Sequence, residues 1–273
     1  MVPLGRAIVN GERPFQRRIF GYDSNMTEPS FHETPQARRI AYHQTPGTGP
    51  GIVFLGGFRS DMTGSKALYL EERARAEGRA FLRFDYSGHG QSSGRFQDGC
   101  IGDWLADARA ALALTTGPQI LIGSSMGGWM ALLLARALPE RVAGLVGVAA
   151  APDFTEDLMW ATATAAQRAE LVEKGQITQP SDYDPAGYPI TLKLIEDGRA
   201  NLVLRDPLHL PMPVRLLQGT ADTDVPVAHA LRLFDHATGP DIRLTLIKGA
   251  DHRLSTTECL TLIWDTAKGL ASP

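Results

Sequence analysis

The sequence is poor in cysteine, in excess basic charge and in long apolar runs. Its 273 residues include two cysteines, Cys100 and Cys259, too few and too far apart for a disulfide framework or a zinc motif. The formal net charge of −3 gives no basic surface for nucleic acid and no polybasic patch for a membrane. No stretch approaches the ~18 apolar residues of a membrane span. We therefore expect a soluble protein with no nucleic-acid partner and no membrane span.

The first 35 residues are polar and contain several prolines, and we expect them to wrap the surface with one short strand at 17–20. Their apolar runs are too short for the hydrophobic region of a secretory signal. Glu12 interrupts an arginine-containing stretch that would otherwise suggest a transit peptide. These features predict a cytoplasmic protein whose two cysteines are reduced thiols.

Short apolar segments alternate with amphipathic ones from residue 39 onward. Strand-like runs at 39–44, 52–55, 80–84, 119–123 and 142–148 alternate with helical segments at 65–77, 102–114 and 126–138. The alternation returns at 214–218, 227–236, 242–247 and 256–270, and residues 45–51 have the composition of a turn. Strands joined through helices of this length form a mostly parallel sheet. The predicted fold class is α/β, with a central sheet flanked by helices.

The alternation stops between residues 151 and 211. This segment contains helical patterns at 155–174 and 191–197 and a loop rich in Pro, Tyr and Asp at 179–189, but no strand-like run. We therefore expect a single domain, 1–273, in which 151–211 is an inserted helical lid.

The pattern Gly-x-Ser-x-Gly occurs twice, so the pattern alone does not identify a nucleophile. Ser125, in the match at 123–127, follows a buried strand and precedes a helix, which is the setting of a nucleophile elbow. Ser92, in the match at 90–94, lies in a glycine-rich loop with neither element. The setting favours Ser125 as the nucleophile over a mere cap of the following helix, and Ser92 as a loop residue.

A serine nucleophile needs a base and a carboxylate that orients the base. His252 is the one histidine that follows the last predicted strand, in the loop 248–252, and we expect it to be the base. The acid should follow the strand at 214–218. Asp222 lies nearer the end of that strand and is preferred, whereas Asp224 is the alternative, either as the acid or as the cap of the next helix.

Acyl transfer develops negative charge on the carbonyl oxygen, which preorganised N–H groups stabilise. We expect one N–H from Met126, directly after the nucleophile, and the other from Phe58 in the loop 56–62. The two glycines that open this loop allow a close approach of backbone to substrate, although a plain turn is the alternative.

Within the expected lid, six apolar residues are candidates to line an acyl pocket, with plain packing as the alternative: Phe154, Leu158, Met159, Trp160, Leu171 and Val172. Arg59 and Arg253 lie beside loops of the site and either contact an acidic substrate or are solvated surface residues. No cofactor and no metal is expected.

Together these motifs resemble the α/β-hydrolase superfamily over roughly residues 38–270. The turn at 85–92 looks like the D-x-x-G-x-G-x-S turn of that superfamily. The segments 57–67, 83–88, 117–129 and 251–253 resemble the mitochondrial palmitoyl-protein thioesterase group, which is also an acyl-glucuronide esterase. The resemblance places the nucleophile, acid and base of that group on Ser125, Asp222 and His252. One departure is Gly56, where the group has a proline.

The expected function is therefore a serine hydrolase that cleaves carboxylic esters or thioesters through an acyl-enzyme. Its partner would be a small-molecule or acylated substrate. Two alternatives stay open: an amidase or peptidase with the same residues, and a non-catalytic binding protein with the same fold. The sequence does not specify the acyl length, the leaving group or the oligomeric state.

Overall fold

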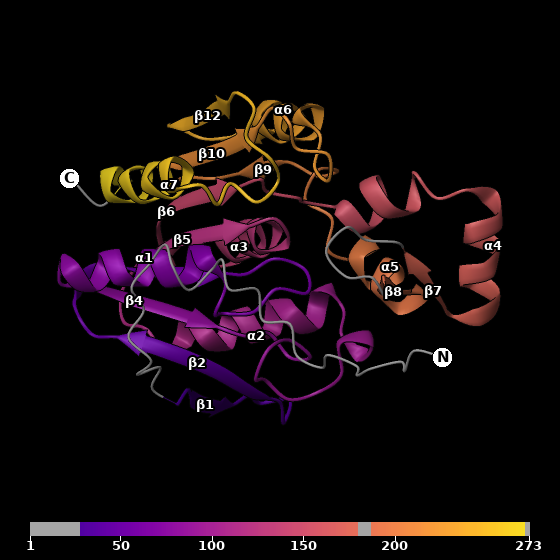
Figure 1. The fold of residues 1–273 in the computed structure, drawn as a ribbon, viewed down its shortest axis with the longest axis horizontal. Helices are drawn as coiled ribbons and strands as arrows, with labels where there is room; N and C mark the ends of the chain where they lie inside the picture. Colours follow the sequence, from indigo (N-terminus) through magenta and orange to yellow (C-terminus); the bar gives the residue numbers. More distant parts are fainter. Residues whose placement is uncertain (1–27, 180–186, 271–273) are drawn as a thin grey trace, which may run out of the picture.

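The computed structural model describes residues 28–179 and 187–270, so the strand expected at 17–20 lies outside the described residues. Their centre is an eight-stranded sheet with the order β1-β2-β4-β3-β5-β6-β10-β12 (Figure 1). β1 (Ser30–Glu33), at one edge of the sheet, runs antiparallel to β2 (Arg39–Thr45), which in turn runs antiparallel to β4. The remaining strands are parallel: β4 (Arg79–Phe84), β3 (Thr48–Leu55), β5 (Gln119–Ser124), β6 (Val142–Val148), β10 (Val214–Gly219) and β12 (Ile242–Ile247). The predicted mostly parallel sheet is confirmed.

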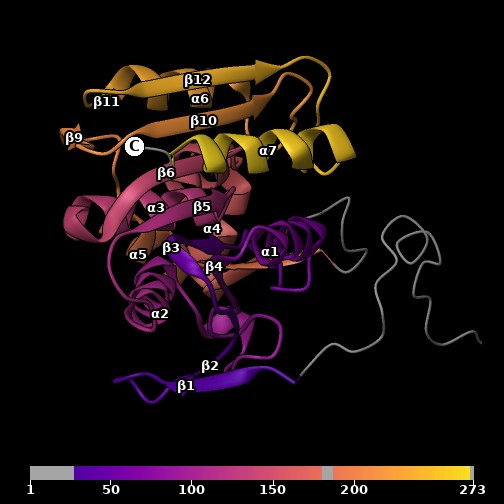
Figure 2. The same ribbon diagram turned by 90° about the vertical axis from the view of Figure 1, so that its left-hand side faces the viewer.

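The central strands are apolar on both faces because helices cover both faces, as Figure 2 shows. Along β3, Val53 and Leu55 join a core cluster with α2 (Ile101–Ala113) and α3 (Met126–Ala137). The alternate residues Ile52 and Phe54 join a second cluster with α1 (Ser65–Ala76) and α7 (Thr257–Leu270). The helix α6 (Val227–His236) adds Leu233 to the first cluster. No helix among the described residues is long and apolar enough to cross a membrane.

The turn expected at 45–51 is wrong, because β3 already begins at Thr48. The N–H of Thr48 donates to the carbonyl of Gly78 at 2.9 Å, and Thr48 pairs with Arg79 of β4. Pro50 has no N–H for the ladder, and the register shifts between Thr48 and Ile52. The composition of a turn is therefore accommodated as an irregularity in a strand.

Between β6 and β10 the chain forms a group of elements that projects beyond one end of the sheet (Figure 1). A π-helical turn at Thr155–Trp160 is followed by α4 (Ala165–Lys174) and α5 (Leu192–Arg199). The single helix expected at 155–174 is divided because Thr164 caps α4, with Gln167 completing a capping box. The expectation that this segment lacks strands is wrong: β7 (Gln176–Gln179) pairs with β8 (Tyr188–Thr191), and β9 (Leu208–His209) pairs with β11 (Ala237–Thr238). Strands this short give no clear alternation in the sequence.

Candidate active site

Ser125 occupies a sharp turn between β5 and α3. Its backbone has φ 55° and ψ −117°, a conformation that residues with a side chain rarely adopt. The N–H of Ser125 donates to the carbonyl of Val148 at 2.9 Å. A Cβ at Gly123 would collide with the backbone of Gly127, and a Cβ at Gly127 would collide with the carbonyl oxygen of Leu55. Glycine at both positions therefore makes this turn possible.

Three side chains from the ends of β5, β10 and β12 form a hydrogen-bonded series. Nε2 of His252 lies 3.1 Å from Oγ of Ser125, and Nδ1 of His252 lies 2.9 Å from Oδ2 of Asp222. The side chain of Asp222 is fully buried, and that of His252 is 17% exposed. A proton on Nδ1 is held by the carboxylate, which leaves the lone pair of Nε2 facing the serine hydroxyl. The structure thus brings together the three residues that the sequence singled out.

The Asp222 carboxylate is held in place by donors on both oxygens. Oδ1 accepts the backbone N–H groups of Asp224 and Val225 at 2.9 and 2.8 Å, and Oδ2 accepts Nε2 of Gln218 at 2.9 Å. Burial opposes ionisation of Asp222, but the hydrogen bonds from His252 and the surrounding donors outweigh it and hold the pKa of this carboxyl below its ordinary value. Asp222 is therefore a fixed negative charge beside the histidine.

Asp224, the alternative acid, is close to the same group. Asp222, Asp224 and His252 present carboxylate and imidazole atoms that lie within 4.8 Å of one another, and this is the one such group among the described residues. Both oxygens of Asp222 and Nδ1 of His252 are already hydrogen-bonded. The cluster is thus explained by hydrogen bonding among its members, and we propose no metal there.

The loop after β3 lies against the nucleophile. A Cβ on Gly57 would come within 3.4 Å of Cβ of Ser125. The Arg59 N–H donates to Nε2 of His89 at 3.2 Å. Within residues 28–179 and 187–270, neither the Phe58 N–H nor the Met126 N–H donates to a protein acceptor. Both expected donors of an oxyanion hole are thus available for a ligand.

His89 was not singled out from the sequence, although it belongs to the turn at 85–92. Its side chain is buried, and its Nδ1 lies 3.2 Å from the carbonyl of Ser87, to which it donates. This leaves Nε2 as the acceptor for Arg59, so the neutral ring holds the loop that carries Phe58. Burial lowers the pKa of His89 to about 4.

The buried His89 predicts a loss of stability in acid. Between pH 6.5 and about 4, the unfolded chain binds a proton at His89 that the folded chain does not bind. The free energy of unfolding therefore falls as the pH falls through this window. Above pH 6.5, His89 is neutral in both states and does not change the free energy of unfolding. Between these two pH values, we expect the free energy of unfolding to fall by about 3 kcal/mol more in wild type than in His89→Gln. Urea unfolding at each pH measures this difference. Glutamine keeps an acceptor for Arg59 but cannot titrate, so equal losses in the two proteins would contradict the prediction.

The Phe58 side chain connects this loop to the inserted segment. Its ring centroid lies 4.8 Å from that of Phe96 and 5.9 Å from that of Trp104, both on the sheet side. It also lies 5.6 Å from Phe154 and 6.1 Å from Tyr188, which belong to the insertion. All four contacts are edge-to-face, the favourable arrangement for aromatic pairs. The backbone of Phe58 is therefore positioned by packing from both sides.

A cavity of about 740 Å³ opens between the sheet and the insertion. Ser125, His252 and the loop of Phe58 form one wall, and Phe154, Leu158 and Met159 line it from the insertion. The other three candidates for an acyl pocket do not line this cavity. Trp160 and Leu171 line a separate cavity of about 260 Å³. Val172 is wrong as a lining residue, since it is 60% exposed and lines neither cavity.

Cationic residues lie along the wall of the larger cavity. Arg59 and Arg253 both line it, and Lys66 is a third cation that the sequence did not indicate. The Arg59 guanidinium lies 4.9 Å from the ring of Tyr188 and donates to the carbonyl of Gly187 at 3.4 Å. Nζ of Lys66 donates to the carbonyl of Arg253 at 2.5 Å, and burial together with the Arg253 charge lowers the pKa of Lys66 to about 8. Arg59 is thus packed against the insertion rather than fully solvated.

Comparison with known proteins agrees with this geometry. Residues 52–180 match the family model described as alpha/beta hydrolase fold. The chain is 38% identical over 239 residues to the rat protein named palmitoyl-protein thioesterase ABHD10, mitochondrial, which covers 87% of this chain and 80% of the relative. The chain belongs to the ABHD10 family of α/β-hydrolases.

Solved structures support the ABHD10 assignment. A putative hydrolase from Agrobacterium vitis S4 has a TM-score of 0.85 at 41% identity and covers 90% of this chain and 100% of its own. The mouse alpha/beta hydrolase domain-containing protein 10 has a TM-score of 0.83 at 36% identity and covers 89% and 98%. The predicted fold, the family resemblance and the enzyme class, a hydrolase of esters or thioesters, are confirmed.

The expected cytoplasmic location is wrong. The ABHD10 relatives from rat, mouse, cattle and human are all named mitochondrial, which points to mitochondria rather than the cytoplasm. The expectation excluded a transit peptide on the ground of Glu12, in a segment that lies outside the described residues. Targeting segments are recognised by an amphipathic pattern over many residues, so one acidic residue is insufficient ground to exclude one.

Proposed function

We propose that this chain cleaves carboxylic esters or thioesters with Ser125 as nucleophile, His252 as general base and Asp222 as the acid that orients it. The observation that carries the proposal is the 3.1 Å distance between Nε2 of His252 and Oγ of Ser125, on the wall of a cavity large enough for a substrate. The thioesterase name of the ABHD10 relatives supports the same bond type.

In the first half-reaction, His252 takes the proton of Ser125 as Oγ attacks the carbonyl carbon. The imidazolium that forms is stabilised by the Asp222 carboxylate, whose lowered pKa keeps it ionised. The negative charge on the carbonyl oxygen is met by the N–H groups of Phe58 and Met126. His252 then gives its proton to the leaving alcohol or thiol, and the acyl group remains on Ser125.

In the second half-reaction, His252 removes a proton from a water molecule, whose oxygen attacks the carbonyl carbon of the acyl-enzyme. His252 then returns that proton to Oγ of Ser125 as the bond between Oγ and the acyl carbon breaks, which releases the carboxylic acid and regenerates the serine hydroxyl. The oxyanion donors act again on the same oxygen. Each step uses groups that the fold already holds in place, so little reorganisation is needed at the moment of reaction.

We further propose that the chain is one domain, 1–273, in which the insertion 151–211 is a lid over the nucleophile. Phe154, Leu158 and Met159 line the cavity that Ser125 also lines, and the contacts of Phe58 with Phe154 and Tyr188 join the insertion to the loop 56–62. A lid in this position excludes water from the reacting carbonyl and determines which acyl groups fit.

The function is tested with p-nitrophenyl butyrate, an acyl thioester of the same chain length and the matching anilide. We expect turnover of the ester and the thioester, labelling of Ser125 by a fluorophosphonate probe, and anilide turnover at least about a hundredfold slower, since the amine is the poorer leaving group. Faster turnover of the anilide would favour an amidase. Absence of turnover and of labelling would favour a binding protein.

A further inference from the structure

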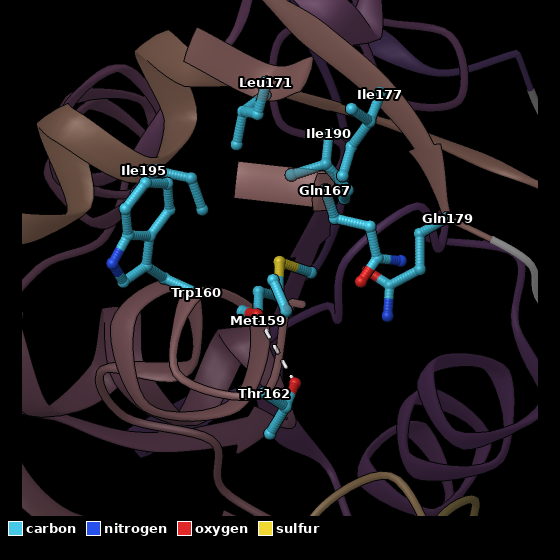
Figure 3. A pocket seen from close by; sticks show the side chains of 10 residues that line it. Met159, Trp160, Thr162, Gln167, Leu171, Ile177, Gln179, Ile190 and Ile195 are labelled. Atoms are coloured by element: carbon cyan, nitrogen blue, oxygen red, sulfur yellow. Dashed lines mark hydrogen bonds between the residues drawn. The ribbon is translucent and has the colours of Figure 1, made fainter. Parts of the chain in front are cut away.

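The insertion encloses a second cavity that the reaction described above does not use. Its volume is about 260 Å³. One side of it is apolar, formed by Trp160, Leu171, Ile177, Ile190 and Ile195, as Figure 3 shows. These residues come from five elements of the insertion: the π-helical turn, α4, β7, β8 and α5.

The polar groups of this cavity lie on its other side and are partly engaged. The hydroxyl of Thr162 donates to the carbonyl of Leu158 at 2.6 Å, and Oε1 of Gln167 accepts the N–H of Thr164 at 2.9 Å. In Figure 3 the amides of Gln167 and Gln179 lie together, away from Leu171. The apolar side of the cavity is therefore a continuous surface without these polar groups.

Met159 and Gln179 line both this cavity and the larger cavity that contains Ser125. A residue that lines two cavities forms part of the wall between them. Methionine is unbranched and has three rotatable bonds, so its side chain can move aside more readily than a branched one. A change in the conformation of the Met159 side chain could therefore open a passage between the two cavities.

We propose that the second cavity receives the distal end of a long acyl chain whose carbonyl carbon lies at Ser125, and that Met159 controls passage into it. This inference rests on the proposed function. The larger cavity would hold the ester or thioester group and the first methylenes. The apolar side of the second cavity would bury the rest of the acyl chain. Each buried methylene strengthens binding about fourfold, so loss of this space should reduce activity on long chains selectively.

The test compares kcat/KM for p-nitrophenyl laurate and p-nitrophenyl butyrate in the full-length protein. Ile177 is half-buried on the apolar side of the second cavity, and Ile177→Phe places a larger side chain in that space. We expect this variant to lower the laurate-to-butyrate ratio of kcat/KM about tenfold. Met159→Ala removes part of the wall between the cavities and should raise the same ratio. Val172→Phe is the matched control, because Val172 is exposed beside Leu171 on α4 and should leave the ratio unchanged.

The outcomes separate this inference from the proposed function. If wild type fails to hydrolyse butyrate, the proposed function falls and this inference falls with it. If wild type hydrolyses butyrate but Ile177→Phe and Val172→Phe give the same ratio, the second cavity is a packing space and only this inference is overturned. If Ile177→Phe does not fold, Met159→Ala decides, and a ratio that does not rise overturns the inference.

Discussion

Replacing Ser125 with alanine should lower kcat for a p-nitrophenyl ester by about 10⁴- to 10⁶-fold while the protein stays folded. The loss is large because the hydroxyl that lies 3.1 Å from Nε2 of His252 is removed, so that His252 has no nucleophile to deprotonate there. The fold should persist because alanine also has a Cβ and bears the same positive-φ strain as serine. Steady-state kinetics and thermal unfolding measure the two halves of this prediction.

Ser92 provides the matched control, since it occupies the same position in the second Gly-x-Ser-x-Gly match. Its hydroxyl donates to the carbonyl of Asp85 at 2.6 Å and accepts the N–H of Ala41 at 2.8 Å, both away from the cavity. Ser92→Ala should therefore cost about 1 kcal/mol of stability and change kcat little. If Ser125→Ala kept full activity, or if Ser92→Ala abolished it, the assignment of the nucleophile would be wrong.

The sheet could be predicted because its central strands are apolar and buried on both faces, and because helices of regular spacing separate the parallel strands. The runs 142–148 and 242–247 coincide with β6 and β12. The irregular parts escaped prediction for different reasons. The start of β3 is rich in glycine and proline yet pairs with β4, and the strands of the insertion are too short for any period to show. Tertiary pairing decides the structure of such segments.

The candidate site could be predicted as far as chain order determines it. Ser125, Asp222 and His252 each follow a parallel strand, and the carboxyl ends of parallel strands meet at one edge of a sheet. The lowered pKa values of His89 and Lys66 depend on their surroundings in the folded chain. Their hydrogen-bond partners, Arg59 and Arg253, are distant in the sequence, so the neighbouring residues give no sign of them. Val172 fits an apolar stripe in the sequence, but helical spacing alone does not say which side of α4 faces the cavity.

Substitution of the acid of the proposed site should cause a second large loss of kcat, and it distinguishes Asp222 from Asp224. Asp222→Asn should lower kcat about 10⁴-fold, because an asparagine amide can donate to Nδ1 of His252 and so favours the tautomer whose Nε2 carries the proton and cannot accept one from Ser125. The asparagine oxygen can still accept the N–H groups of Asp224 and Val225, so the loop should keep its shape.

Asp224→Asn is the matched variant for the same loop and the same loss of one charge. We expect it to change kcat less than about tenfold, because the carboxylate that contacts Nδ1 of His252 at 2.9 Å belongs to Asp222. Kinetics of both variants on one ester, with thermal unfolding to confirm that each is folded, measure the difference. A near-normal Asp222→Asn beside an inactive Asp224→Asn would assign the acid to Asp224, since in that case His252 would have to turn toward the second carboxylate during the reaction.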